Sequence, residues 1–374
     1  LSTYYMYQNV YNVGGVYNYG DGIGQNNYMV VQTGNTDIAW IERNEFNIGV
    51  ESSILNRLLS FEFNYFESTR FNEITRLANT YPQFMGGGDF VAYQNYAKRM
   101  QKGFEADINF NKQINDFRID IDFNMINLVP TRLVLDELDY GPGYEYRQRA
   151  GKANDGLWGL VANGLYTQDE IDKINDPSDQ TVPKPNFGAV QAGDIKYVDI
   201  DNDKVIDEKD IKMIGNSQAR FNYGLRINLG YKNFNLFVFG QAETGFYSFN
   251  NDSYNWVYGE MKYPAYLVNR WAYDPILGVD TRETATYPRL TTQNNTNNFR
   301  NSTFWLTKRD YFSIPAVQFT YDIPKIRNFI TLKEVSVYAR VENLITVSAD
   351  KYATLNVGNS PQLRMYFLGI KADF

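Results

Sequence analysis

An acidic segment in the middle of the chain has the clearest coordination chemistry in the sequence. Carboxylates stand at relative positions 1, 3, 5, 9 and 12 of the twelve residues from Asp199 to Asp210, and a backbone carbonyl is available at position 7. This spacing matches the ligands of a calcium-binding loop, and hard oxygen ligands favour Ca²⁺ or Mg²⁺ over softer metals. The predicted metal ligands are Asp199, Asp201, Asp203, Asp207 and Asp210, with the carbonyl of Val205.

Two residues of this loop depart from the calcium pattern. Position 6 is Lys204, where the sharp turn favours Gly, and position 12 is Asp210 instead of the longer bidentate Glu. Two interpretations therefore stay open. The loop either holds Ca²⁺ or Mg²⁺, which would stiffen it, or forms an acidic, solvated turn that binds no ion.

The residue types that are missing exclude several kinds of chemistry. The sequence has no His and no Cys, which excludes Ser-His-Asp triads, ordinary zinc sites and disulfides. We therefore expect that the chain is not an enzyme. With 36 basic and 43 acidic residues the net charge is -7, the wrong sign for a surface that binds phosphates, so no nucleic-acid partner is expected.

Alternation of apolar and polar residues predicts the elements that carry this loop. From Phe221 to Tyr231, large apolar residues occupy every odd position and Asn, Gly or Arg every even one, the period of a β-strand. Eleven residues are about enough for a tilted strand to cross a bilayer. About nine strands are expected, at residues 40–52, 55–67, 104–110, 117–125, 221–231, 233–246, 307–322, 332–345 and 363–374.

Composition leaves two classes of β protein. The chain of 374 residues is 16% aromatic, yet its mean hydropathy is -0.46, and no apolar stretch approaches the roughly 18 residues of a membrane helix. A transmembrane barrel fits, since its strands alternate between lipid-facing and lumen-facing residues. The alternative is a soluble β-sandwich or a surface glycan-binding β protein.

The connections between the expected strands favour the barrel. Short joints at 52–56, 111–115, 232–233 and 322–331 alternate with long segments at 69–97, 129–217, 247–306 and 346–362. Outer-membrane barrels have such tight periplasmic turns and large extracellular loops. The predicted fold class is all-β, an antiparallel transmembrane outer-membrane β-barrel with long extracellular loops. Because single-chain barrels have an even strand count, we expect further strands upstream of residue 1, and no signal peptide is expected within the first residues.

The C-terminal strand is predicted to act as a barrel-assembly signal. Its last residues alternate and end in Phe, and such a strand resembles the signal that outer-membrane assembly machinery recognises. The alternative is an edge strand that happens to stop at Phe. The residues of the predicted signal are Tyr366, Leu368, Ile370 and Phe374.

A block of motifs resembles the SusC/RagA family of TonB-dependent transporters. The block begins with Gly193-Asp194-Ile195-Lys196-Tyr197, continues through the acidic run, and ends with Ile214-Gly215-Asn216 and Phe221-Asn222-Tyr223-Gly224. Further similar segments lie at 40–49, 311–324 and 341–344, so the resemblance covers essentially the whole chain. Where the family usually has Asp-Gly, this sequence has Asp203-Lys204.

The resemblance implies a specific architecture and role. Residues 1–374 would be the C-terminal portion of a large, plugged barrel of the 22-stranded class in the bacterial outer membrane, surrounded by lipid. Such proteins import oligosaccharides or peptides with energy delivered through TonB. The family's plug domain and TonB box precede the barrel and have no counterpart in this sequence. A SusD-like lipoprotein would cover the extracellular mouth and dock on the long loops.

Aromatic residues in two of the long segments are candidates for contact with substrate or with the lipoprotein. Their rings could stack on sugars, or they could pack the loops onto one another. An adhesive or structural barrel without transport also stays open as an alternative function. The six candidates are Trp158, Tyr166, Tyr254, Trp256, Tyr258 and Trp271.

Overall fold

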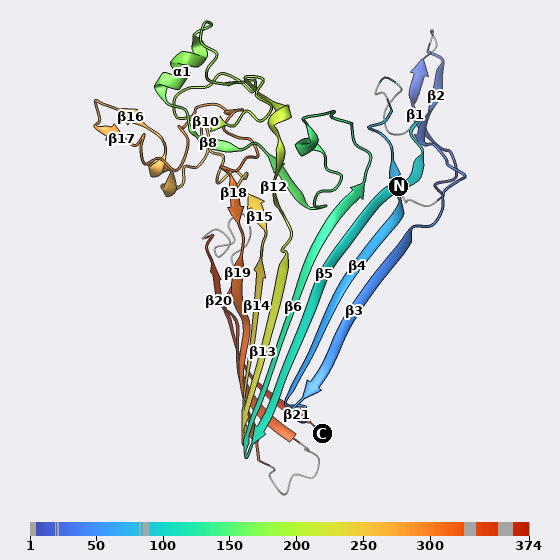
Figure 1. Ribbon diagram of the computed structural model, residues 1–374, viewed down its shortest axis with the longest axis vertical. Helices are drawn as coiled ribbons and strands as arrows, with labels where there is room; N and C mark the ends of the chain where they lie inside the picture. Colours follow the sequence, from blue (N-terminus) through green and yellow to red (C-terminus); the bar gives the residue numbers. More distant parts are fainter. Residues whose placement is uncertain are drawn as a thin grey trace. The chain divides into compact units, whose positions relative to one another are not determined.

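A nine-stranded sheet forms the framework of the computed structural model, which describes residues 5–18, 20, 22–81, 84, 90–324, 334–350 and 362–373 (Figure 1). Within this sheet each strand pairs with the sheet strand that precedes or follows it along the chain. The pairings from β6 to β21 are antiparallel. The strands in chain order are β3 (Glu42–Ile54), β4 (Leu59–Arg76), β5 (Tyr93–Ile114), β6 (Phe117–Val134), β13 (Phe221–Tyr231), β14 (Phe234–Thr244), β19 (Tyr311–Ile323), β20 (Glu334–Ser348) and β21 (Met365–Asp373).

The predicted strands are confirmed, but three of them are longer than expected. β4 and β6 have 18 residues each and β5 has 22. The extra residues of β5 begin at Tyr93 and are mostly polar. Because apolar and polar residues do not alternate there, the sequence did not predict a strand. Pairing partners hold this part in place, since Arg99 Nε lies 2.5 Å from Glu73 Oε2 in the neighbouring strand. Tertiary pairing therefore overrides weak local propensity here.

Three of the predicted tight joints are confirmed. They span residues 55–58, 115–116 and 232–233, and Asn115 and Lys232 adopt the positive φ that such tight turns need. The fourth joint, 322–331, falls largely outside the described residues, as does most of the segment 346–362.

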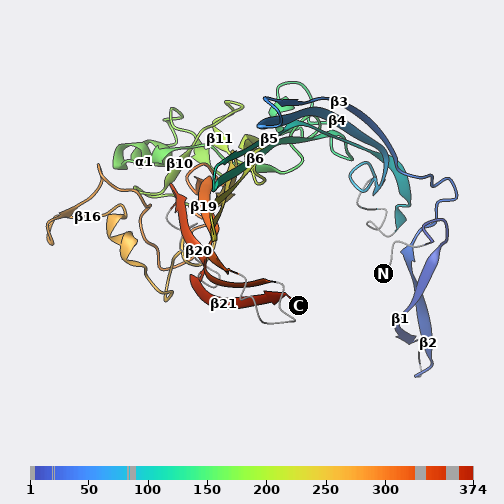
Figure 2. The same ribbon diagram turned by 90° about the horizontal axis from the view of Figure 1, so that it is seen from below.

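The strand register sorts the side chains into two faces. Leu229 pairs with Ile119 on one side and with Leu236 on the other, and the same row continues through Phe319, Ala339 and Leu368 across β19, β20 and β21. Figure 2 shows β20 lying between β19 and β21. One residue along, the opposite face carries Asp120, Asn228, Gln318 and Arg340 together with two Phe residues. The sheet thus has one apolar face and one largely polar face.

The apolar face has no protein cover within the described residues. Leu368, for example, is 88% exposed, and Ile370, Tyr231 and Phe319 are also exposed. A contiguous apolar surface of this kind marks contact with another apolar phase. On the polar face, the ring of Tyr338 lies across Gly369, where a Cβ atom would stand 2.4 Å from the ring, so a larger residue would require the ring to move.

The chain divides into two compact units. The first comprises Leu1–Ile48, Tyr65–Gly103 and Val129–Asn154, and the second comprises Gly49–Asn64, Phe104–Leu128 and Asp155–Phe374. The first unit contains a hairpin of β1 (Val10–Asn18) and β2 (Gly24–Gln32) that the sequence analysis did not predict. A register shift between Val13 and Val16 breaks its alternation, which explains why the pattern was missed.

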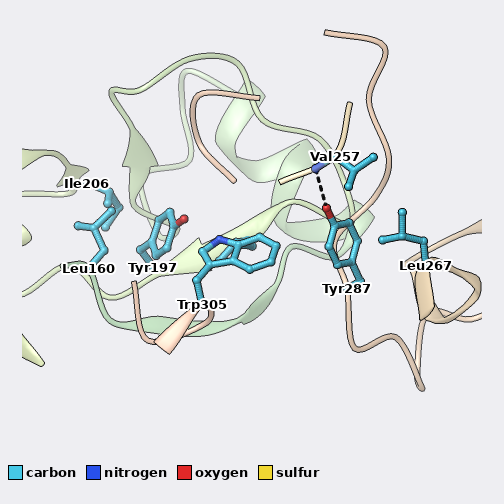
Figure 3. Close-up of a cluster of buried hydrophobic side chains, with 8 residues drawn as sticks. Leu160, Tyr197, Ile206, Val257, Leu267, Tyr287 and Trp305 are labelled. Carbon is cyan, nitrogen blue, oxygen red and sulfur yellow. Dashed lines mark hydrogen bonds between the residues drawn. The ribbon is translucent and has the colours of Figure 1, made fainter. Parts of the chain in front are cut away.

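The second unit has its own hydrophobic core, and this core lies in the loops. Side chains from the small two-stranded sheets and the loops beside them form this core, and they include Leu160, Tyr197, Val257 and Trp305 (Figure 3). The helix α1 (Gln168–Asn175) contributes Ile171 to a second, smaller cluster. No helix among the described segments is long and apolar enough to cross a membrane. The small sheets pair β7 (Gly156–Gly159) with β12 (Lys212–Asn216), β8 (Ala162–Leu165) with β10 (Ile195–Tyr197), β9 (Lys184–Pro185) with β11 (Val205–Ile206), β15 (Tyr247–Phe249) with β18 (Leu306–Lys308), and β16 (Tyr273–Asp274) with β17 (Val279–Asp280).

The two-faced sheet predicts a sharp asymmetry between neighbouring substitutions. Ile227→Arg places a charge on the apolar face, and at the middle of a bilayer this costs about 2–4 kcal/mol. We expect the folded fraction in outer membranes, measured by heat-modified gel mobility, to fall sharply. Asn228→Arg, one residue away on the polar face, serves as the control and should assemble normally. Equal assembly of both variants would contradict the lipid-facing assignment.

Candidate functional site

A buried carboxylate organises the loops of the second unit. Asp194 is fully buried, and its Oδ1 lies 2.8 Å from Arg289 Nε and accepts hydrogen bonds from the side-chain amides of Asn295 and Asn298 at 3.0 and 2.9 Å. Its Oδ2 accepts the backbone N–H of Gln191 at 2.8 Å. A buried charge persists only when paired and hydrogen-bonded, and Asp194 meets both conditions.

The amides around Asp194 also hold the strand that follows it. Asn298 Oδ1 accepts the backbone N–H of Ile195, and Asn297 Nδ2 donates to the Ile195 carbonyl. The Trp305 indole donates to the Asn298 carbonyl at 2.7 Å, and the Tyr197 hydroxyl donates to the Asn297 carbonyl at the same distance. Two loops that are about a hundred positions apart in sequence are thereby fixed to each other.

Glycine is required beside this carboxylate. Gly193 has φ +87, and a Cβ atom there would stand 2.4 Å from the ring of Trp271. In the sequence, Gly193-Asp194-Ile195 stands out only as part of a resemblance, and its structural role was not predicted. The Asn-rich run at 295–298 was also missed, because nothing local distinguishes a buried amide from one in a polar loop.

The structure brings three of the predicted metal ligands together. Asp199, Asp201 and Asp203 each offer a carboxylate oxygen, and these oxygens lie within 4.8 Å of one another. Lys204 at position 6 has φ +70, the left-handed conformation for which the calcium loop normally uses Gly. The Lys204 N–H donates to Asp199 Oδ2 at 2.9 Å, so the first half of the loop has a calcium-loop turn despite its lysine.

The other predicted ligands serve the backbone instead. Both oxygens of the buried Asp210 accept N–H groups, from Ile200 at 2.6 Å and Asp207 at 2.8 Å. Burial raises the pKa of Asp210, although these hydrogen bonds oppose the shift. Asp207 accepts the N–H of Lys209 and thereby caps a short 3-10 turn. The carbonyl of Val205 remains a predicted ligand.

An internal cation lies beside the carboxylate cluster. Lys209 Nζ is 2.6 Å from Asp203 Oδ2 and 4.0 Å from Oδ2 of both Asp201 and Asp207. Its hydrogen bond lowers the pKa of the Asp203 carboxyl. Any metal ion at this loop would therefore compete with an ammonium group for the same oxygens.

Most of the aromatic candidates pack within the loops. Tyr166 is buried against Ile171, in a cluster that Trp271 also contacts, and burial raises its pKa. Trp256 stacks on Phe299 with ring centroids 5.7 Å apart, and Trp158 lies in β7 opposite β12. The more accessible candidates are Tyr254, which is exposed and adjoins Tyr266, and the half-buried Tyr258.

The strand predicted as an assembly signal has the expected alternation. Tyr366, Leu368 and Ile370 in β21 pair with Val341, Ala339 and Val337 of β20 on the apolar face. Phe374 lies outside the described residues. The part of the signal that is described therefore belongs to the apolar surface of the sheet.

The polar face of the sheet is hollowed near its tight turns. A cavity of about 520 Å³ is lined by residues of β14, β19, β20 and β21, including Asp322, Glu334, Arg340 and Lys371. Farther along this face, Arg226 Nε donates to Asp122 Oδ2 at 2.6 Å. This surface offers paired charges and amides, which suit contact with water or with polar solutes.

Comparisons with known proteins show similarity to a TonB-dependent receptor and to a peptide transporter. The chain is 22% identical over 386 aligned residues to TonB-dependent receptor P3 of Formosa agariphila, covering 93% of this chain and 36% of the relative. It also superimposes on a chain of the RagAB peptide transporter with a TM-score of 0.70, at 20% identity, covering 99% of this chain and 39% of the other. No protein-family model matches.

The same fold is found in two functional states of a related assembly. Chains of the RagAB peptide importer in its open-open and closed-closed states match with TM-scores of 0.72 and 0.71, at 19% and 20% identity. The chain spans less than two fifths of the length of each of these relatives. The predicted all-β fold of outer-membrane barrel type is confirmed, and the relatives are named as a receptor and as transporters, not as enzymes.

The buried Asp194 network predicts a selective loss of loop order. Asp194→Ala leaves Arg289 and two buried amides without their partner, which costs about 3–5 kcal/mol. We expect the backbone amides of Ile195 and Tyr197 to lose hydrogen-exchange protection. Asp169→Ala, which removes an exposed partner of Lys173, is the matched control and should leave exchange unchanged. Retained protection in Asp194→Ala would show that the network does not order these loops.

Proposed function

We propose, from the premise that this chain has the sequence and fold of a SusC/RagA-type TonB-dependent transporter, that it is the C-terminal barrel portion of a nutrient importer in the bacterial outer membrane. The observation that carries the proposal is the sheet itself. One face presents an unbroken apolar row across six strands from β6 to β21, and the other presents charges and amides. A barrel wall between lipid and an aqueous lumen needs both faces.

The polar face supplies the wall of the import path. Its Asp122–Arg226 pair and the charged hollow near the turns place fixed polar groups along the strands. Such groups replace water around a solute that carries many hydrogen-bonding groups. The substrate in this proposal is an oligosaccharide or a peptide, and the relatives named as peptide transporters favour testing peptides first.

The loops are proposed to lie outside the cell and to bind a SusD-like surface lipoprotein. Large loops join the strands at one end, and tight joints join them at the other, as expected when the large loops are extracellular. The Asp194 network and the hydrophobic core make these loops a firm surface. In this proposal the energy for import arrives through TonB.

The acidic loop is proposed as a Ca²⁺ or Mg²⁺ site that stiffens this surface. Asp199, Asp201 and Asp203 lie close enough to share one ion, and oxygen ligands suit these hard cations. The ion would displace Lys209 from Asp203. The proposed role of the ion is structural.

Import can be tested with the full-length protein in its own host. Loss of the protein, or of TonB, should abolish growth on the substrate class that it carries, either peptides or oligosaccharides as the sole nutrient. The wild-type protein purified from outer membranes should co-isolate with a SusD-like lipoprotein. Normal growth on both nutrient classes without the protein would contradict import and favour an adhesive barrel. A chain that stays monodisperse without detergent would favour a soluble glycan-binding protein.

Metal binding to the acidic loop predicts opposite effects of two substitutions. Removal of a carboxylate in Asp201→Asn should abolish Tb³⁺ luminescence and its competition by Ca²⁺, since the cluster loses charge and a ligand. Lys209→Gln should strengthen Ca²⁺ binding, because the competing ammonium is removed. Asp176→Asn, in another loop turn, is the control and should bind as the wild type does. Luminescence that is equal in all four proteins would exclude the site.

A further inference from the structure

The hairpin of β16 and β17 presents two bare aliphatic side chains to solvent. Ile276 is 93% exposed, the highest value for any large apolar side chain among the described residues, and its neighbour Leu277 is 75% exposed. Both lie at the tip of the hairpin, which Figure 1 labels β16 and β17. We call this tip, residues 274–278, the aliphatic knob. Single exposed apolar residues are common, but these two are held in place by contacts of the turn and of the stem.

The turn of the knob is rigid. Asp274 Oδ1 accepts the backbone N–H groups of Ile276 and Leu277, at 2.9 and 3.1 Å. Pro275 fixes its own φ, and Gly278 has φ +66, a conformation that glycine adopts without strain. Both side chains are therefore displayed by a preset backbone.

The stem of the hairpin is braced by its own side chains. Tyr273 pairs with Asp280 across the two strands. The Arg282 guanidinium lies 3.9 Å from the centre of the Tyr273 ring and donates to both oxygens of Asp280, at 2.9 and 2.7 Å. The Thr281 hydroxyl donates to the Arg270 carbonyl at 2.6 Å. The stem cannot fold back to bury the tip without breaking these contacts.

The base of the hairpin continues into the core of the loops. The N–H of Trp271 donates to the carbonyl of the buried Tyr287 at 2.8 Å, and the ring of Trp271 covers Gly193 beside Asp194. Leu267, which precedes the hairpin, is buried in the same core. Displacement of the knob would thus be transmitted to the loop core.

These contacts lower the entropic cost that a partner's binding to the knob would incur. A preformed turn loses little conformational entropy on association, and apolar side chains that fill a partner's pocket are typical binding hot spots. The residues from 273 to 283 include Asp274, Asp280 and Glu283 against Arg282, three acids minus one base, a net charge of -2. A matching pocket would be apolar with a basic rim.

The charges argue against lipid as the occupant. Segments that lie in a membrane interface are rich in Lys and Arg beside their apolar residues, whereas this hairpin is acidic. We propose that the aliphatic knob inserts Ile276 and Leu277 into an apolar, basic-rimmed pocket on the SusD-like lipoprotein. This inference rests on the proposed function and adds the anchor point of that partner.

The test compares the affinity of the purified full-length transporter for its co-isolated and separated lipoprotein. Ile276→Asp combined with Leu277→Asp should raise Kd at least about 10-fold, as loss of a hot spot does. Ile276→Ser combined with Leu277→Ser, which keeps the tip neutral, should also weaken binding. Val268→Asp changes another aliphatic residue of the same loop, which is 69% exposed, and should bind as the wild type does.

A photo-crosslinking residue at position 276 provides the second measurement and should capture the lipoprotein in intact outer membranes, while the same residue at position 268 should not. If the wild type binds the lipoprotein but both knob variants bind equally well, or position 276 captures only lipid, the inference is overturned and the proposed function stands. If the wild-type transporter has no lipoprotein partner, both fail. Unchanged melting of the variants excludes misfolding as the cause of weak binding.

Discussion

Backbone hydrogen bonding between consecutive strands is the constraint on which the rest of the molecule depends. In hydrocarbon no water is available to satisfy N–H and C=O groups, so a sheet must satisfy them by pairing. Pairing with a fixed register has a second effect, because a slip of one residue would exchange the two faces. The apolar row through Leu229, Phe319 and Leu368 crosses six strands in register, whereas β-bulges shift the β14–β19 pairing between Phe239 and Gln241 and the β19–β20 pairing between Ile314 and Ala316.

A single sheet of this kind encloses no side chains, so the hydrophobic core lies in the segments between the strands. The segments between strands are long enough to enclose Leu160, Val257 and Trp305, and they use buried polar groups to join distant parts of the chain. Asp194 does this with charge, and Asn297 and Asn298 do it with amides. The loops thereby gain a fixed shape, which the sheet alone could not give them.

The nine-stranded sheet could be predicted from the sequence better than the loops, for a physical reason. Alternation is a local pattern, so residues 221–231 reveal a strand without knowledge of its neighbours. Asp194 accepts a hydrogen bond from Asn298, which is 104 positions away in the sequence, and no local sequence pattern predicts such a contact. The acidic loop lies between these cases. Asp199, Asp201 and Asp203 lie close together, as their spacing suggests, whereas the spacing does not reveal that Asp207 and Asp210 accept backbone N–H groups.

Lys209 gives the acidic loop a permanent positive counter-charge, which a dissociable ion would not give. Its ammonium is covalently tethered to the loop, so its effective concentration at the carboxylates is high and independent of the medium. A loop that relied on a dissociable metal would loosen in surroundings rich in chelators. This loop keeps one counter-charge in dilute or chelating conditions alike, and divalent ions would act on it as modulators of an already folded turn.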